Sequence, residues 1–333
     1  MSEVEGPVFV SSEAASDVFV WREAIEALTE CYGEQLEPGA IPPRAVGGDR
    51  GAWLRTLPAL PPGRRYFGAK VMGMAMTAPD PGAELVIVLY DRETSRIAAF
   101  VDASRVTAYR TAATSAAALA RLAPPGPMRL GVIGSGMEAT MHVRAFATVR
   151  PIERLWVTSS TPARREAFAA AVQTDLGVPA EAVDTAAAAA EGASVVLAAA
   201  RSRDERPLLF GEWLAPQTVV VSIGSTIPSQ REVDSSVVDA CDLIVCDDVD
   251  EVLEQTGDML AAERAGLEFR ERTFSLHALL SGQLDDRLRS SRRPLFKSVG
   301  GGLQDVVVGE LVLRKALAAG LATPTSIRFE TKR

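Results

Sequence analysis

The chain has 333 residues, of which 47% are apolar, and its 43 acidic side chains exceed the 35 basic ones to give a formal net charge of -8. A chain of this length can bury a full core and is expected to divide into two domains. The acidic balance argues against a nucleic-acid partner, because no basic excess exists to neutralise phosphates. No uncharged apolar stretch approaches the roughly 18 residues that a membrane span needs, so no membrane partner is expected.

The cysteines and the first residues bear on the compartment. Cys31, Cys241 and Cys246 are an odd set without metal-type spacing, which is typical of reduced structural thiols. The acidic start of the chain shows no basic stretch followed by an apolar run, so no signal peptide is predicted. We therefore expect a cytoplasmic protein.

The first third of the chain predicts an α+β arrangement. Apolar residues recur at helical spacing over residues 16–32, and a proline-rich connection follows at 38–43. Strand-like segments, the last two forming a hairpin, cover residues 53–57, 66–72, 84–90 and 97–101. A helix-forming run over 108–122 then ends at a proline cluster around Pro124, which is typical of a linker.

Beyond this linker, apolar strands alternate with helices. The strands are predicted at 130–133, 155–158, 194–198, 218–223 and 243–246. The helices are predicted at 137–148, 162–174 and 186–191, with one or more between 248 and 265. This alternation predicts a doubly wound parallel sheet. We take the sheet to be complete at residue 246, so the segment from Leu295 and a final helix over 303–319 are expected to return to the first domain.

A glycine-rich turn opens the alternating part. Gly134 would permit a tight turn, Gly136 would let the backbone approach a pyrophosphate, and Ala139 would let the following helix pack on the strand. The pyrophosphate would meet free amides at a helix N-terminus, where the dipole favours negative charge. We therefore assign Gly134, Ser135, Gly136 and Met137 to dinucleotide binding.

The end of the second strand predicts which dinucleotide is bound. An NAD-type unit usually places Asp or Glu there, whereas this chain has no acid between Val157 and Arg165. The stretch instead contains the hydroxyl and guanidinium groups of Ser159, Ser160, Thr161, Arg164 and Arg165. Such groups suit a 2′-phosphate, so NADP(H) is favoured over NAD(H). The alternative is that both arginines are solvated residues in the first turn of a helix.

Three cations of the first domain are candidates for substrate binding. Arg44, Lys70 and Arg110 stand at the ends of apolar segments. Each could be a surface or ion-pair residue. If they converge, the arginines would hold a substrate carboxylate and the lysine would carry a tunable proton.

Other polar residues favour structural roles. His142 and His277 fall in helix-like stretches, and no cluster with zinc spacing or serine-nucleophile motif is present. The acidic run from Asp247 to Glu251 follows a strand and is expected to cap a helix rather than bind a metal. No metal site is predicted.

Together these residues resemble the ornithine cyclodeaminase/μ-crystallin family over most of the chain, from Pro43 to the C-terminal helix. The marks of the resemblance are Lys70 after a strand, Arg110-Thr111-Ala112-Ala113, the Gly134-Ser135-Gly136 turn, Gly224-Ser225-x-x-Pro228-x-x-Arg231-Glu232-Val233-Asp234, Gly257-Asp258 and Phe296-Lys297-Ser298-Val299-Gly300.

The resemblance implies a fold class and a homodimer. It implies an α/β protein in which a Rossmann domain with a doubly wound parallel sheet, residues 125–299, is inserted into an α+β domain for substrate binding and dimerisation, residues 1–124 and 300–333. By position, Lys70 and Arg110 match the catalytic cations, and with Arg44 they match the substrate-carboxylate site. The family's nucleotide contacts map onto Thr111, the glycine turn, Gly224, Ser225 and Thr226, and Val299 and Gly300 match a segment beside the nicotinamide and substrate.

One departure from the family argues against cyclodeamination of ornithine. Cyclodeaminases are similar to one another in an Asp two residues after the glycine aligned with Gly224, whereas this chain has Thr226. A hydroxyl supplies no comparable charge or base for a side-chain amine. Glu138 also stands where many relatives carry Gln.

The function predicted is therefore NAD(P)H-dependent reduction of C=N bonds in α-imino acids or cyclic ketimines, including reductive amination. The substrate would be a small carboxylate-bearing imine, or a 2-oxo acid with an amine. Two alternatives remain open: an oxidative synthase or dehydrogenase of N-substituted amino acids, and a μ-crystallin-like NADPH-dependent ligand-binding protein.

Overall fold

The computed structural model of the chain describes residues 6–78, 82–200 and 206–331. Residues 1–5, on which the signal-peptide expectation falls, lie outside the described part. The chain divides into two compact units, Met1–Arg110 with Gly301–Arg333, and Thr111–Gly300. Helix α3 (Ala103–Leu122) continues from the first unit into the second. The boundary at Arg110 thus precedes the proline cluster around Pro124.

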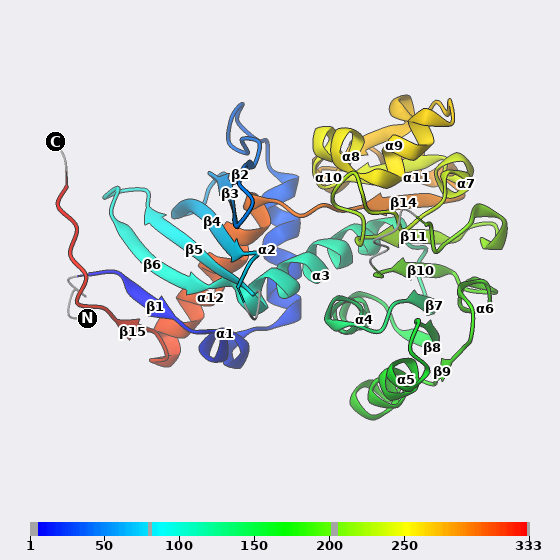
Figure 1. Cartoon of the computed structure of the whole chain (residues 1–333), viewed down its shortest axis with the longest axis horizontal. Coiled ribbons are helices and arrows are strands. Elements are labelled where there is room, and N and C mark those ends of the chain that lie inside the picture. Colours follow the sequence, from blue (N-terminus) through cyan, green and yellow to red (C-terminus); the bar gives the residue numbers. More distant parts are fainter. Residues whose placement is uncertain (1–5, 79–81, 201–205, 332–333) are drawn as a thin grey trace. The chain divides into compact units, whose positions relative to one another are not determined.

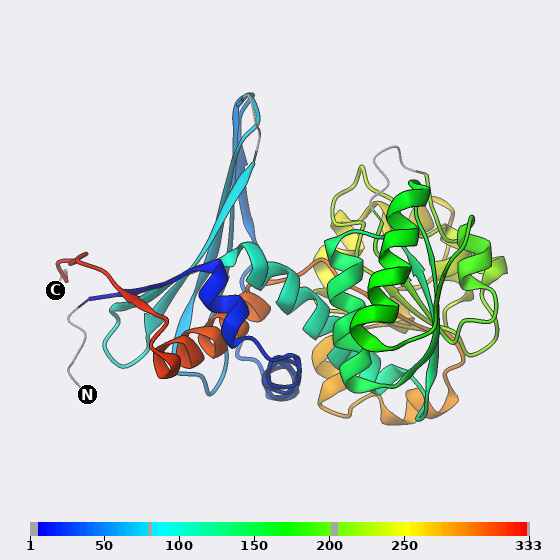
Figure 2. The same cartoon turned by 90° about the horizontal axis from the view of Figure 1, so that it is seen from below.

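The first unit is built on a seven-stranded sheet with the order β15-β1-β6-β5-β4-β3-β2. Its strands are β1 (Val8–Val10), β2 (Ala45–Gly48), β3 (Ala52–Ala59), β4 (Tyr66–Ala75), β5 (Ala83–Asp91), β6 (Ile97–Asp102) and β15 (Thr323–Pro324). Neighbours from β2 to β6 are antiparallel, as the hairpin patterning predicts. Strands β3, β4 and β5 continue into a long projecting arm (Figure 2). Strands β1, β2 and β15 were not predicted: β1 and β15 are too short to show a periodic pattern, and two of the four residues of β2 are glycines.

Three helices belong wholly to the first unit: α1 (Ser12–Val18), α2 (Trp21–Gly33) and α12 (Gly302–Ala319). The single helix predicted over residues 16–32 is wrong, because the backbone is extended at Phe19 and Val20. The Phe19 ring stacks on Tyr109 at a centroid distance of 4.1 Å, a contact that sequence periodicity does not reveal.

Helix α12 packs on strands β3, β4 and β5 (Figure 1). Glycine permits this close approach at the start of the helix, since a Cβ at Gly302 would lie 2.5 Å from the carbonyl oxygen of Pro58. Most residues of α12 are buried, and its first turn lies directly against the sheet.

The second unit contains an eight-stranded parallel sheet with the order β13-β12-β14-β11-β10-β7-β8-β9. Its strands are β7 (Met128–Ile133), β8 (Ile152–Thr158), β9 (Ala180–Ala182), β10 (Val195–Ala198), β11 (Val219–Ser222), β12 (Leu243–Cys246), β13 (Thr273–Ser275) and β14 (Pro294–Lys297). The strands around β7 follow the Rossmann order, in which the order reverses between β7 and β10. The α/β fold class with a Rossmann-like unit is confirmed.

The expectation that the sheet is complete at residue 246 is wrong. Strand β14 inserts between β11 and β12 and pairs with both. All four of its residues are buried, so this segment is a central strand of the second unit before the chain returns to the first. Leu295 and Phe296 supply the apolar side chains that a central strand buries on its two faces, and Lys297 at its end is buried with Asp258 as its ion-pair partner.

Helices lie on both sides of this sheet (Figure 2). They are α4 (Met137–Val149), α5 (Pro162–Leu176), α6 (Ala186–Ala190), α7 (Ser235–Ala240), α8 (Val249–Gln255), α9 (Gly257–Arg264), α10 (Leu276–Leu280) and α11 (Asp285–Ser290). Within the described residues, no helix has the length and hydropathy that crossing a bilayer requires.

Candidate active site

Lys70 lies in the middle of the first sheet, on the face that α12 covers. It pairs with Leu57 on β3 and with Ile87 on β5, and the residue is only 1% exposed. Its ammonium lies 2.9 Å from the carboxylate of Asp305, in the first turn of α12, and 3.4 Å from the Thr107 hydroxyl. A lysine at such a depth requires a charged partner, and the first turn of α12 supplies it.

Arg110 joins the same cluster from α3. Its Nε donates to the Asp305 carboxylate at 2.9 Å, and its Nη1 donates to the Gln304 side chain at 2.7 Å. The Gln304 amide in turn donates to the Tyr32 hydroxyl at 3.1 Å. One buried carboxylate therefore orients two buried cations, and the three groups together keep a net positive charge.

Arg44 immediately precedes β2, at the edge of this sheet, and its side chain is half-buried. Its charge lowers the pKa of Lys70, so its field reaches the buried ammonium. Lys70 and Arg110 thus share Asp305 as a partner, and Arg44 acts on Lys70 through its charge.

The pKa of Lys70 is lowered to about 8. Burial is the largest cause, and the charges of Arg110 and Arg44 add to it, whereas Asp305 opposes the shift by attraction and by its hydrogen bond. A lysine with this pKa carries a proton at neutral pH and can release it at little cost, which is the property of a general acid.

The sequence analysis missed Asp305. Its signal was a polar pair, Gln304 and Asp305, at the start of a helix that otherwise reads Val306-Val307-Val308 and onward as apolar. Both side chains are fully buried, and a buried carboxylate without a partner would be costly, so such a pair indicates a cation on the facing element.

In the second unit, the glycine turn joins β7 to α4. Gly134 has φ of 117°, and a Cβ there would lie 2.6 Å from the carbonyl oxygen of Ala199, so only glycine fits. Gly136 is the N-cap of α4, and the space beside its missing Cβ is open. Met137 is exposed at the first position of the helix, and Ala139 is fully buried. This geometry fits an anion at the amides of the α4 N-terminus.

Beside this turn, the end of β8 carries the predicted 2′-phosphate groups. The Ser135 hydroxyl donates to that of Ser159 at 2.9 Å, while Ser160, Thr161 and Arg164 are exposed. Arg165 bonds to the carbonyl of Ser159 and pairs with Asp184, which follows β9. The segment at the end of β8 contains no acidic residue, but folding brings the carboxylate of Asp184 to the guanidinium of Arg165.

Most of the remaining predicted residues follow the carboxyl ends of β11 and β14. These ends lie at the same edge of the sheet as the end of β7, because β7, β10, β11 and β14 are parallel neighbours. Gly224, Ser225 and Thr226 form the turn after β11, where the Ser225 hydroxyl donates to the carbonyl of Gln230 at 2.6 Å. After β14, the amides of Val299 and Gly300 donate to Asp247 at 3.0 and 2.8 Å. Thr111, the next residue of α3 after Arg110, is half-buried.

The other candidates hold structural positions. His142 is buried, with its ring nitrogens 2.7 Å from the carbonyl of Glu138 and 3.0 Å from the Ser115 hydroxyl. Asp248 caps α8 by accepting from the amide of Glu251, as predicted. The three cysteines are free and buried, and burial raises the pKa of each thiol. Across the described ranges, no group of three His, Cys, Asp or Glu side chains is placed to hold a metal ion.

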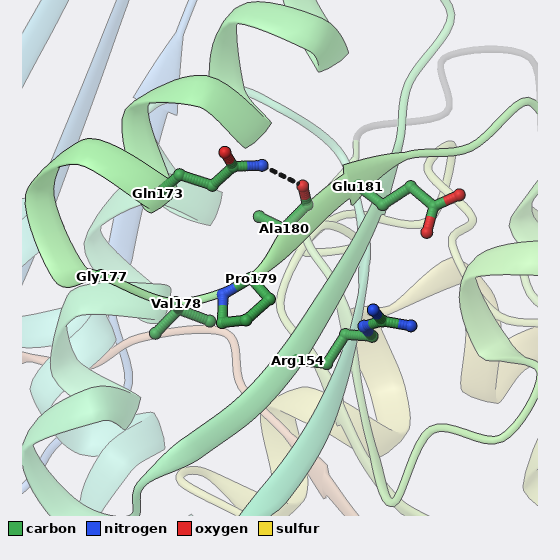
Figure 3. Close-up of a pocket in the computed structure, with 7 residues that line it drawn as sticks. All are labelled: Arg154, Gln173, Gly177, Val178, Pro179, Ala180 and Glu181. Atoms are coloured by element: carbon green, nitrogen blue, oxygen red, sulfur yellow. Dashed lines mark hydrogen bonds between the residues drawn. The ribbon is translucent and has the colours of Figure 1, made fainter.

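A hollow of about 510 Å³ lies elsewhere on the second unit, between the C-terminal end of α5 and the start of β9 (Figure 3). Arg154, near the start of β8, and Glu181 are among the residues that line it. The strands run from this side toward the glycine turn, so the hollow is remote from the carboxyl ends where α/β sheets bind ligands.

A Rossmann sheet with a glycine turn at its carboxyl edge, and a separate unit with a buried lysine in a mainly antiparallel sheet, define a class of two-unit nucleotide-binding proteins. The chain belongs to the ornithine cyclodeaminase/mu-crystallin family, whose model matches residues 19–320. This confirms the resemblance on which the assignment of site residues rests.

Several of the similar proteins are named as reductases of imino acids. The chain is 28% identical over 322 residues to Delta(1)-pyrroline-2-carboxylate reductase of Paracoccus denitrificans, covering 92% of this chain and 96% of the relative. It is 32% identical over 246 residues to iminosuccinate reductase of the same organism, covering 72% and 73% of the two chains. The structure of Delta(1)-pyrroline-2-carboxylate reductase of Thermococcus litoralis with NADH and L-proline is similar at a TM-score of 0.87 and 25% identity, covering 96% of this chain and 100% of the other.

Proposed function

We propose that this protein is an NAD(P)H-dependent oxidoreductase that reduces the C=N bond of small α-imino acids or cyclic ketimines. The observation that carries the proposal is the buried Lys70, held by Asp305 beside Arg110, with its pKa lowered to about 8. The names of two relatives, Delta(1)-pyrroline-2-carboxylate reductase and iminosuccinate reductase, support this proposal.

In this mechanism the bound NAD(P)H supplies the hydride. Arg110 and Arg44 bind the substrate carboxylate and orient the imine, an effect that can supply several kcal/mol. Lys70 holds a proton at its Nζ and transfers it to the imine nitrogen, so that C=N becomes CH–NH. Asp305 keeps Lys70 protonated near neutral pH and fixes the direction of its ammonium.

The proposal is tested by following NADPH and NADH oxidation with a panel of acceptors. The panel contains pyrroline-2-carboxylate, piperideine-2-carboxylate, and pyruvate, glyoxylate or oxaloacetate with ammonia or methylamine. We expect turnover with at least one cyclic ketimine or one pair of 2-oxo acid and amine. Tight NADPH binding without any turnover would instead favour the ligand-binding alternative.

The proposal includes a preference for NADP(H). Arg164 carries it, because this exposed arginine stands in the first turn of α5, shortly after the exposed Ser160 and Thr161 in the sequence. Arg165 is engaged with Asp184. NADP carries a 2′-phosphate and NAD does not, so an arginine that binds this phosphate raises the affinity for NADP alone.

Arg164→Ala is expected to lower kcat/KM for NADPH by about tenfold, as the loss of a charge-assisted hydrogen bond implies. The kcat/KM for NADH should stay unchanged. Steady-state kinetics with both nucleotides measures this. Arg154→Ala, which removes an arginine at the other end of β8, is the matched control and should change neither value. A wild-type enzyme that prefers NADH would contradict the assignment.

We also propose a cytoplasmic homodimer. Exposed apolar side chains occur on both faces of strands β2 to β4 and just beyond, and such side chains would favour contact with a second copy. They are Val46, Leu54, Met74 and Met76. A molar mass measured by light scattering tests the dimer.

A further inference from the structure

Three of the sequence motifs converge in the second unit without taking part in the proposed chemistry. The turn that contains Glu232, the Gly257-Asp258 pair that begins α9, and Lys297 at the end of β14 meet in one buried cluster. We call Ser222, Glu232, Asp258 and Lys297 the Glu232 network. All four side chains are fully buried.

Glu232 is the acceptor at the centre of this network. One carboxylate oxygen accepts from the amides of Ile223 and Gly224 at 3.0 and 2.8 Å, and from the Ser222 hydroxyl at 2.8 Å. The other oxygen accepts from the amide of Ala200 at 2.8 Å. A single side chain therefore fixes the backbone that leaves β10 and the backbone that leaves β11.

The other members hold Glu232 in place. Asp258 accepts from the amides of Glu232 and Val233 at 2.7 and 3.1 Å, and it pairs with Lys297 at 2.9 Å. Lys297 donates to the Ser222 hydroxyl at 2.9 Å, which closes the ring of contacts. Burial raises the pKa of the Glu232 carboxyl, and the Lys297 ammonium and the donors oppose that shift.

Two glycines allow close approaches that this network requires. A Cβ at Gly224 would lie 2.3 Å from Oε1 of Glu232, and a Cβ at Gly257 would lie 2.2 Å from the carbonyl oxygen of Gln230. The first glycine lets the carboxylate lie directly over the turn after β11. The second lets the start of α9 press against the Glu232 turn, which brings Asp258 to its amides.

The position of these turns in the sheet suggests what they serve. In a Rossmann sheet the first three strands, here β7, β8 and β9, take the adenosine half of the dinucleotide, and the strands beyond the reversal take the other half. The turns held by Glu232 follow β10 and β11, beyond the reversal. We infer that Glu232 is a positioning residue that shapes the site for the nicotinamide half of the nucleotide, an inference that rests on the proposed nucleotide-dependent function.

The test compares nucleotide binding by Glu232→Gln with that of the unchanged enzyme. An amide cannot accept at both of its atoms, so one backbone donor loses its partner. We expect the Kd for NADPH and NADH, measured by nucleotide fluorescence, to rise about tenfold or more. The Kd for ADP and adenosine 2′,5′-bisphosphate, which probe the adenosine half alone, should stay within about twofold.

Thr218→Val is the matched control. The Thr218 hydroxyl is also buried and donates to the carbonyl of Ala193 at 3.0 Å, but it stands just before β11 begins, at the opposite edge of the sheet. This variant loses a buried hydrogen bond in the same sheet, and its affinity for NADPH should not change. Ser222→Ala, which removes the hydroxyl between Glu232 and Lys297, should show the same selective loss in milder form if Glu232→Gln does not fold.

Three outcomes would overturn the inference. Unchanged NADPH affinity in both Glu232→Gln and Ser222→Ala would do so, and so would equal losses for NADPH and the adenosine fragments, since the latter indicates a general disturbance of the unit. Failure of the unchanged protein to bind any of these nucleotides would overturn the proposed function together with this inference. Selective loss for the complete dinucleotides supports it.

Discussion

Lys70→Met is expected to lower kcat for imine reduction by about a hundredfold to ten-thousandfold, the usual contribution of a positioned general acid. Methionine fills a similar volume on the buried face of β4 but carries no proton. Asp305 would still be paired with Arg110, so the cluster would not be left with an isolated carboxylate. The affinity for NADPH, measured by fluorescence titration, should be unchanged.

Lys315→Met is the matched control for this substitution. Lys315 also lies on α12, about 15 Å along the helix from Asp305, and pairs with Glu23 at 2.7 Å. Its loss should leave kcat unchanged. Retained turnover in Lys70→Met would contradict the role of Lys70 as proton donor.

Asp305→Asn is expected to move the pH dependence of the reaction to lower pH. Reduction requires the ammonium form of Lys70, so in the unchanged enzyme kcat/KM should fall as pH rises through about 8. Asp305 raises the pKa of Lys70, so replacing its carboxylate by a neutral amide lowers that pKa further. The falling limb of the profile, the pH range in which kcat/KM declines, then moves to lower pH. The loss of a buried ion-pair partner should also lower the free energy of unfolding by about 3–5 kcal/mol.

The pH profile of kcat/KM and a urea unfolding curve measure these two effects. Asp91→Asn removes another carboxylate paired with an arginine of the same unit, Arg65, and should leave the limb in place. A limb that stays or moves upward in Asp305→Asn would contradict the coupling of Asp305 to Lys70. A reaction that instead accelerates as pH rises through about 8 would favour the oxidative alternative, in which Lys70 must accept a proton.

The sequence analysis recovered the main elements because their physical signals are local. Buried parallel strands such as β7, β10 and β11 are short apolar runs, and the turn after β7 is indicated by Gly134, which no other residue can replace there. The strands β1 and β9 were missed because three residues cannot display a period. The break between α1 and α2 was missed because helical spacing continues across it; there the Phe19 ring stacks on Tyr109, far along the chain.

The candidate site divides in the same way. Lys70 and Arg110 were predicted as residues, but Asp305, which joins them, lies 235 positions from Lys70 in the sequence. Likewise Asp184 reaches Arg165 only because β9 pairs with β8. No spacing rule connects such residues, since the distance between them is set by strand pairing and helix packing.

The sequence by itself determined the class of protein: a glycine turn before a helix, alternating apolar strands, and the motifs that place the chain in its family. The tertiary structure alone decided how charges are partnered: the burial of Lys70 against Asp305, the insertion of β14 between β11 and β12, and the convergence of three motifs on Glu232. The physical reason is that backbone propensity and hydrophobic period act between near neighbours in the chain. The pKa of a buried group depends instead on every charge that folding brings within a few ångströms.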